Sequence, residues 1–210
     1  MGQSADTPTP AIPDKYAFGV IPNNRTVEAS LPFEPISARR KLTIGAKDSF
    51  AVPIYVNTSL FATIYQLDNE NPSFGQGVAG YARRLGASFA DQAIGNMMSE
   101  GVMPSILKED PRYFRRGEGS KKSRTAYALT RIFVTRTDSG GSRFNFSEVL
   151  GNSSAVAFSN VYYPDTRTAS ENAEKLAMQL ATDAFSNVLK EFWPDVKHHF
   201  LHRHDIHSGH

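Results

Sequence analysis

The chain of 210 residues has no cysteine, and its six histidines all lie within residues 198–210. The absence of cysteine excludes disulfides, thiolate catalysis and cysteine-ligated metals, although it fits both a cytosolic and an oxidising compartment. Because residues 1–197 hold neither histidine nor cysteine, the body of the protein offers no imidazole base and no soft metal ligand. We therefore expect no cofactor and no metal site there.

Net charge and long apolar runs are also scarce. The formal charge of +2 is too small to indicate nucleic acid by itself. The longest run without a charged residue is 49–67, which would span roughly 28 Å as a helix, close to a bilayer core. This run contains Pro53 and several polar residues, so we favour a soluble or membrane-peripheral protein over an integral one. The first residues lack a signal-peptide pattern and resemble the polar start of a mature exported protein.

Proline divides the chain. Residues 1–35 hold six of the twelve prolines, which predicts an extended arm. The remainder predicts a mainly α fold, a closely packed helical bundle over 36–195 followed by a flexible His-rich tail over 196–210. The predicted helices are 48–67, 77–102, 123–136, 147–162 and 168–192, the last stopped by Pro194. The β-branched run 131–137 also fits a strand.

Small and amide residues recur in the predicted helices. Small residues stand four apart in three rows, which are Ala82, Gly86 and Ala90; Gly151, Ala155 and Ser159; and Ala169, Ala173, Ala177 and Ala181. Such rows let helix backbones approach closely. A short phrase ending in asparagine recurs at Asn96, Asn152, Asn160 and Asn187, and these amides could form hydrogen bonds between helices. The alternative is that Gly-Asn and Ser-Asn pairs simply reflect the composition.

Two motifs resemble catalytic or nucleotide-binding loops. The stretch 137–142, TDSGGS, is similar to the nucleophile loop of trypsin-like proteases, but no histidine precedes Ser139, so we interpret it as a turn. The stretch 75–80, GQGVAG, matches G-x-G-x-x-G, but a loop rich in proline and asparagine precedes it instead of a strand. We interpret it as the start of a helix.

Catalysis in the body would depend on carboxylates or on lysine, tyrosine, serine and arginine. The candidate carboxylates are Asp48, Asp91, Glu100, Glu148 and Asp183, for which helix capping or surface solvation is the simpler interpretation. An enzyme that acts on lipid or glycan would need Asp91 to converge with Glu148 or Asp183 in one cleft. His198 and His202, at helical spacing, could bind a divalent metal, although short His-rich tails are commonly adventitious ligands.

Positive charge gathers in one segment. Residues 108–143 hold ten basic and four acidic side chains, so the rest of the chain is net negative. Cations alternate with aromatic rings there, which suits an anionic surface such as lipid headgroups, lipopolysaccharide or nucleic acid. The candidate binding residues are Arg112, Tyr113, Arg115, Arg116, Lys121, Lys122 and Arg124. The alternative is a solvated loop whose arginines pair with neighbouring carboxylates.

Five phrases, EDPRYFRRGEG, ASFADQAIGN, TRTDSG, FNFSE and NVLKEFWPD, together resemble an uncharacterised family of exported bacterial envelope proteins. The resemblance covers about residues 45–195 and implies an exported, envelope-associated helical protein in the periplasm or at the outer membrane. It implies no known reaction. The family pattern has a histidine before the acidic pair, and this chain has Lys108 instead.

The sequence thus predicts a non-enzymatic, envelope-associated helical protein that binds a partner, self-assembles or contacts an anionic membrane surface. The expected partners are anionic lipid, lipopolysaccharide or another protein, with the chain as a homo-oligomer or complex subunit. Nucleic acid is the least favoured partner. A carboxylate-dependent enzyme acting on lipid or glycan is the alternative.

Overall fold

The computed structural model describes residues 16–17, 21–22 and 25–207, with side chains over 25–196. The fold is mainly α, as predicted. The helices are α1 (Ala38–Asp48), α2 (Val52–Leu67), the 3-10 turn η1 (Pro72–Phe74), α3 (Gly77–Asn96), the π-helix η2 (Met97–Val102), α4 (Met103–Leu107), α5 (Lys121–Thr130), α6 (Phe146–Ser159) and α7 (Ala169–His207).

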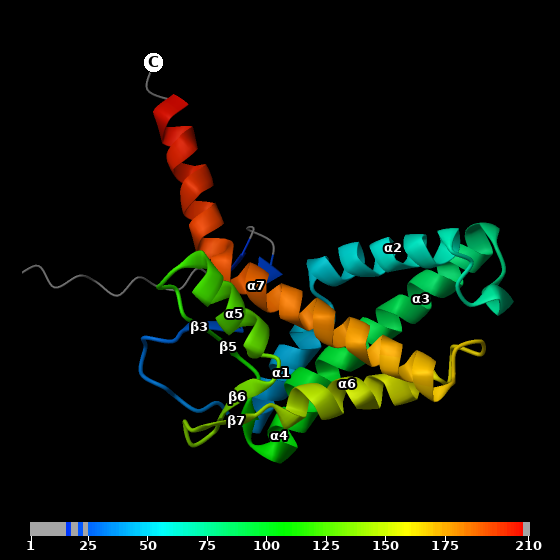
Figure 1. The fold of residues 1–210 in the computed structure, drawn as a ribbon, viewed down its shortest axis with the longest axis horizontal. Helices are drawn as coiled ribbons and strands as arrows, with labels where there is room; N and C mark the ends of the chain where they lie inside the picture. Colours follow the sequence, from blue (N-terminus) through cyan, green and yellow to red (C-terminus); the bar gives the residue numbers. More distant parts are fainter. Residues whose placement is uncertain (1–15, 18–20, 23–24, 208–210) are drawn as a thin grey trace, which may run out of the picture.

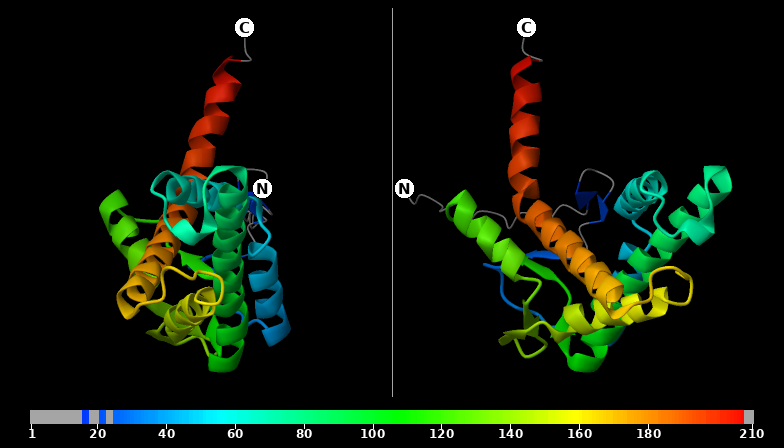
Figure 2. Two further views of the ribbon diagram at one scale, coloured as in Figure 1. Left: turned by 90° about the vertical axis from the view of Figure 1, so that its right-hand side faces the viewer. Right: turned by 45° about the vertical axis from the view of Figure 1, so that its right-hand side comes forward.

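Helix α3 forms the centre of the bundle (Figure 1). It packs against α1, α2 and α6, and it continues directly into η2, which contacts α1 and α6. Helix α7 packs on α5 and α6. Figure 2 places α1 and α7 on opposite sides of α3. One face of the bundle is therefore formed by α1 and the opposite face by α7, with α3 between them.

Short strands connect the helices into one body. Strands β4 (Glu109–Asp110), β6 (Val134–Thr137) and β7 (Ser142–Phe144) form a small antiparallel sheet, and β3 (Thr26–Glu28) pairs in parallel with β5 (Tyr113–Arg115). A further antiparallel pair joins β1 (Tyr16–Ala17) to β2 (Ile21–Pro22). Most of residues 1–24 lie outside the described part, so the extended arm predicted for 1–35 stays a prediction.

Side chains at the helix ends explain several boundaries. The Ser37 hydroxyl accepts from Arg40 N at the start of α1, and the Asn145 side chain accepts from Glu148 N at the start of α6. Pro53 lies in the first turn of α2, where its missing N–H is no loss. Helix α3 begins at Gly77, so the GQGVAG stretch is a helix start, as interpreted. The loop before it is held by the fully buried Arg84, which donates to three backbone carbonyls.

Two predictions for secondary structure are wrong. Residues 134–137 form strand β6 and not helix, because pairing with both β4 and β7 outweighs the local helical pattern. Pro194 does not stop α7, which bends towards its C-terminal part and continues (Figure 1). A proline leaves a helix carbonyl without its N–H partner. In α7 the carbonyl that loses its partner is that of Lys190, four residues before Pro194. The next carbonyl, that of Glu191, accepts from Arg115 Nε at 2.9 Å and Arg124 Nη2 at 2.7 Å, so side-chain donors hold α7 close to the proline.

Only one of the three predicted rows of small residues lies in the core. Gly151, Ala155 and Ser159 are all buried, whereas Ala82 and Gly86 on α3 and the row 169–181 on α7 face outward. A second close approach, which the sequence analysis did not find, joins Gly45 of α1 to Gly101 of η2. The outward rows show that spacing alone does not determine which face of a helix is buried.

Candidate functional site

The basic segment 108–143 is held largely by internal carboxylates. Arg112 binds Asp110, with Nη2 to Oδ2 at 2.6 Å, and Arg143 Nε binds Glu109 Oε1 at 2.7 Å. Arg115 pairs with Glu28 and with Asp195, both at 3.0 Å. Glu109 and Asp110 are almost fully buried. The arginines of this segment therefore pair both with acids of the same segment and with acids elsewhere in the chain.

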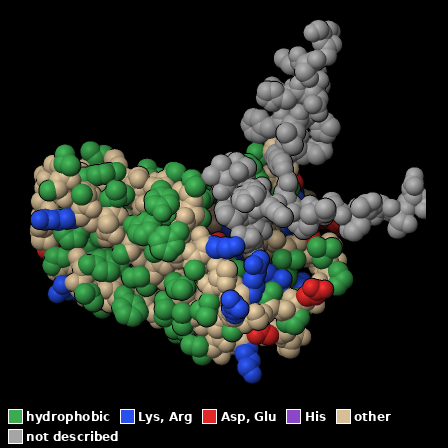
Figure 3. Space-filling model, turned by 180° about the vertical axis from the view of Figure 1, so that it is seen from behind, with side chains coloured by type: hydrophobic (Ala, Val, Ile, Leu, Met, Phe, Trp, Pro, Cys, Tyr) green, Lys and Arg blue, Asp and Glu red, His purple; other side chains and the backbone are tan. Residues whose placement is uncertain are grey.

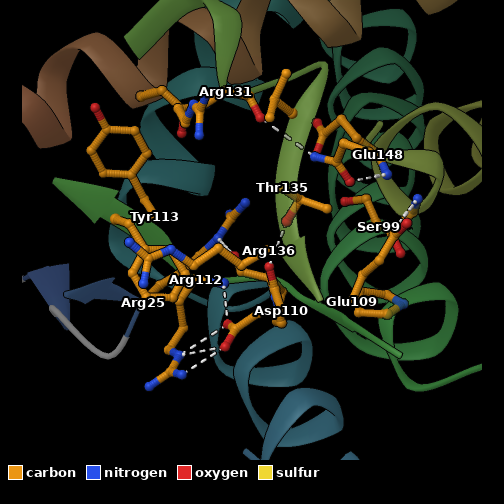
Figure 4. Close-up of a pocket in the computed structure, with 17 residues that line it drawn as sticks. Arg25, Ser99, Glu109, Asp110, Arg112, Tyr113, Arg131, Thr135, Arg136 and Glu148 are labelled. Atoms are coloured by element: carbon orange, nitrogen blue, oxygen red, sulfur yellow. Dashed lines mark hydrogen bonds and ion pairs between the residues drawn. The ribbon is translucent and has the colours of Figure 1, made fainter. Parts of the chain in front are cut away.

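Figure 4 shows the small cavity that these residues line, where Glu109 and Asp110 approach Ser99, Thr135 and Glu148. Its volume is ≈ 30 Å³, room for about one water molecule. Glu109 also accepts from Ser147 N at 2.7 Å and so caps helix α6. The polar groups of this cavity serve the junction between the strands and α6.

A second cluster surrounds the buried carboxylate of Glu191 on α7. It accepts from Tyr113 Oη at 2.8 Å, Arg124 Nε at 2.8 Å, and the N–H groups of Arg116 at 3.0 Å and Gly117 at 2.9 Å. Burial raises the pKa of Glu191, but these donors outweigh it and leave the pKa below its usual value. The cluster fixes strand β5 and helix α5 against α7.

The structure thus divides the seven predicted surface-binding residues. Arg112, Tyr113, Arg115 and Arg124 make the internal contacts described above. Arg116, Lys121 and Lys122 are exposed, and Arg116 donates to Ser123 Oγ at 3.0 Å. Only these three present their charge to the outside.

The TDSGGS stretch forms the turn between β6 and β7, as interpreted. Gly140, with φ of 87°, donates its N–H to the carbonyl of Thr137 at 2.9 Å. Asp138 accepts from Nζ of Lys41, which is only 1% exposed, at 2.6 Å. Ser139 Oγ lies 2.8 Å from Thr137 Oγ1. The aspartate ties this turn to α1, an ion pair that sequence spacing does not predict.

The five candidate carboxylates converge around the centre of the bundle. Arg25, next to β3, forms an ion pair with Glu100 of η2 and lies 3.9 Å from Asp48 at the end of α1. A single amide, Asn152 Nδ2, donates to Glu148 at 3.2 Å and to Asp183 at 3.1 Å.

Asp91 completes this group from α3. It accepts from Tyr162 Oη at 2.6 Å and Tyr163 Oη at 2.8 Å, and it lines a small cavity together with Asp183. Asp91 thus shares a cavity with Asp183, as the enzyme alternative requires, whereas Glu148 is joined to Asp183 through Asn152, and each of the three carboxylates already accepts a hydrogen bond from the protein.

Burial shifts the ionisation of these groups. Burial raises the pKa of Glu148 well above its usual range, and the Asp183 charge adds to the shift. Burial also raises the pKa of Asp48, against the Arg25 charge, and raises the pKa of Asp91 to about 6, against its two tyrosine hydrogen bonds. Lys190 is affected in the opposite sense, because burial lowers its pKa to about 8. Opposite charges thus meet in a poorly solvated centre.

The four predicted asparagines differ in their surroundings. Asn152 bridges two carboxylates, Asn96 lines two cavities beside α3, and Asn187 is buried beside the Glu109 cavity. Asn160 ends α6, and its Oδ1 is buried without a hydrogen-bond partner among the described residues. Among them, only Asn152 makes the hydrogen bond between helices that the phrase predicts.

A ≈ 150 Å³ cavity, here named the central cavity, lies between β3, the N-terminal turn of α2, α3, η2 and α7. Its charged lining consists of Arg25, Asp48, Glu100, Asp183 and Lys190. Glu100 reaches it from the π-helix, an element often found at functional sites. Sequence analysis identified the three carboxylates of this lining but not its two cations. Arg25 lies in the predicted extended arm, and the sequence around Lys190 is typical of a lysine on the surface of a helix.

The outer face of α1 and α2 has a different character. Large apolar side chains are exposed on both helices and on the turn between them. These side chains are Leu42, Phe50, Val52, Tyr55, Val56, Leu60, Ile64 and Leu67. The exposed charges of α1 are the cations Arg39, Arg40 and Lys47, and α2 carries no charge. We name these residues the α1–α2 surface. Figure 3, which views the molecule from behind, shows apolar side chains spread over much of the surface, with lysine and arginine more frequent towards one side and also present at the opposite edge.

Among the described residues, no helix is both long enough and apolar enough to cross a bilayer, and no three potential metal ligands come together. Comparison with protein-family models, curated proteins and solved structures gives no significant match. The resemblance to an exported envelope family therefore stays a prediction.

Proposed function

We propose that the protein is a non-enzymatic, peripheral membrane-binding protein whose α1–α2 surface lies against an anionic lipid surface. One observation carries this proposal. Helix α2 leaves most of its large apolar side chains exposed, including Val56 at 66% and Leu67 at 80%. Contiguous apolar surface of this kind is uncommon on monomeric soluble proteins unless it binds something.

Charge supports lipid as the occupant. The acid within the two helices, Asp48, faces Arg25 and is only 19% exposed, and Lys41 is buried against Asp138. Every exposed charge on α1 and α2 is therefore positive. Helices that lie in a membrane interface combine an apolar face with lysine and arginine, and each cation near an anionic surface contributes about 1 kcal/mol.

Vesicle flotation tests the apolar part of the proposal. The full chain should float with vesicles of phosphatidylcholine and phosphatidylglycerol, and less with phosphatidylcholine alone or at high salt. The double variant V56S/L60S should lose most of this binding. F185S/L189S is the matched control, because these two side chains are similarly exposed but lie on α7. Binding lost equally in both variants would contradict the assignment to α1–α2.

A second pair of variants separates the two basic surfaces. R39Q/R40Q/K47Q should weaken binding to anionic vesicles and reduce its salt dependence, whereas R116Q/K121Q/K122Q should change both less. The reverse result would assign the contact to the exposed remainder of segment 108–143. No binding by the unmodified chain, together with a dimer that V56S/L60S dissociates, would overturn the proposal in favour of self-assembly.

The proposal extends to location. We propose an envelope-associated protein, exported to the periplasm or the outer-membrane surface, as the family resemblance implies. Fractionation of the source cells should place the chain in the membrane pool at low salt and release part of it at high salt. Recovery in the cytosolic pool alone would contradict this part of the proposal.

A further inference from the structure

Two charged side chains that line the central cavity, Glu100 and Lys190, are incompletely satisfied by the residues that the structure describes. Glu100 is only 2% exposed, and its Oε1 pairs with Arg25, but its Oε2 has no hydrogen-bond partner among the described residues. A buried charged oxygen without a donor costs roughly 1–3 kcal/mol or more. Such an atom is uncommon in a folded protein, and it points to a donor that a bound molecule supplies.

The same cavity contains an unmatched cation. Lys190 of α7 lines it and forms no ion pair within residues 25–196, although Asp48 and Asp183 lie near enough to influence it electrostatically. Its pKa of about 8 keeps most of the molecules protonated at pH 7. The cavity thus offers a donor with positive charge and an acceptor with negative charge.

The volume of the central cavity and its uncharged lining residues limit the class of ligand further. A cavity of about 150 Å³ can hold a molecule of the size of benzene. Ala51, Pro53 and Ile54 form an apolar side, while Asn57 and Asn96 offer amides. The formal charges of Arg25, Lys190, Asp48, Glu100 and Asp183 nearly balance, which disfavours a ligand with a large net charge.

We propose that the central cavity binds a small zwitterionic amino acid, with its carboxylate at Lys190, its ammonium at Glu100 and its side chain against Pro53 and Ile54. A zwitterion supplies both missing partners at once without adding net charge to a poorly solvated site. A polyol would leave Lys190 without a counter-ion and could offer Glu100 Oε2 only a neutral donor, and a simple amine or carboxylate would satisfy only one of the two groups.

Isothermal titration calorimetry on the full chain tests this inference with L-alanine, L-serine, L-proline and L-valine as probes. At least one should bind saturably with one site per chain. Ethylamine and propionate, which each carry one half of alanine, should bind at least tenfold more weakly, because each loses one charged hydrogen bond. Erythritol should not bind measurably.

Two lysine variants locate the site. K190M should weaken amino-acid binding at least tenfold, because it removes the cation but keeps the length of the side chain. K175M is the matched control, since Lys175 is also on α7 but donates to the carbonyl of Thr166 at 2.6 Å, outside the central cavity. Circular dichroism should show that both variants fold.

Three results would overturn the inference. They are no binding by any of the four amino acids, equal binding of alanine and one of its half-analogues, and equal loss of affinity in K190M and K175M. None of these results depends on the membrane contact, because V56S/L60S should keep amino-acid binding while losing vesicle binding.

Discussion

At the scale of single residues, the side chain of Glu191 shows how an acid can be required for stability without being catalytic. All four groups that it contacts are donors, two from side chains and two from the backbone. E191Q should reduce the free energy of unfolding by about 3–5 kcal/mol, because it leaves buried donors facing an amide NH₂. Urea denaturation at neutral pH measures this change.

The exposed Glu174, also on α7, gives the control, and E174Q should change stability by no more than about 0.5 kcal/mol. The pKa of Glu191 is lowered in the folded state. Its contribution is therefore present above the unfolded pKa and is lost as the pH falls through the lower folded value. An E191Q protein as stable as the unmodified chain would contradict this role.

The ionisation of Asp91 affects stability in the opposite direction to that of Glu191, because folding raises the pKa of Asp91. Its folded pKa of about 6 exceeds the ordinary value of 3.8, so the folded state holds the proton more tightly than the unfolded state. Stability should therefore decrease as the pH rises from about 4 to about 6, by at most about 3 kcal/mol. D91N should remove this part of the pH dependence. Urea midpoints at about pH 4 and about pH 6.5, the two ends of this window, measure the change. An equal change of midpoint with pH in D91N and in the unmodified protein would contradict the assignment.

Some residue-scale features could be predicted from sequence. The TDSGG turn follows from local chemistry, since aspartate, serine and glycine favour turns wherever they occur together. The ion pairs of Lys41 with Asp138 and of Arg25 with Glu100 could not be predicted, because they join residues far apart in the chain. The positions of the five carboxylates were identifiable, but their convergence depends on how the helices are rotated.

At the scale of elements, the crossing of α6 over η2 is the closest helix contact that the glycines reveal. A Cβ at Gly151 would lie 2.5 Å from Ser99 Cα, so G151A must push two backbones apart. We expect it to destabilise the protein by about 1–3 kcal/mol. G86A is the matched control, because no atom lies within 4 Å of its added Cβ. It should be neutral or stabilising by up to about 1 kcal/mol.

Chemical denaturation of both glycine variants measures this difference. Similar stabilities for G151A and G86A would show that the crossing adapts to a methyl group. The comparison also explains what spacing can and cannot predict, since Gly86 and Gly151 each belong to a regular row of small residues but only one row is buried. The same limit applies to strand β6, because its conformation depends on pairing with β4 and β7 and not on its own sequence.

At the scale of the whole molecule, the N-terminal strand β3 joins the part of the chain before α1 to the core. Thr26 pairs with Tyr113, and Arg25 neutralises Glu100. A chain that begins at residue 29 should be less stable than one that begins at residue 25 by about 3–5 kcal/mol, because Glu100 stays buried without its cation. Thermal and urea unfolding of the two truncated chains measure the difference, and equal stabilities would contradict a structural role for this strand.

The parallel pairing of β3 with β5 has a consequence during protein synthesis. Residues 26–28 leave the ribosome long before their partners at 113–115 exist, so this segment must wait for nearly ninety further residues to be translated. Glu100 also emerges before Tyr113, without the strand that brings Arg25 to it. The β3–β5 pair therefore forms only after residues 113–115 have been translated, and α6 and α7, which complete the bundle, are made later still.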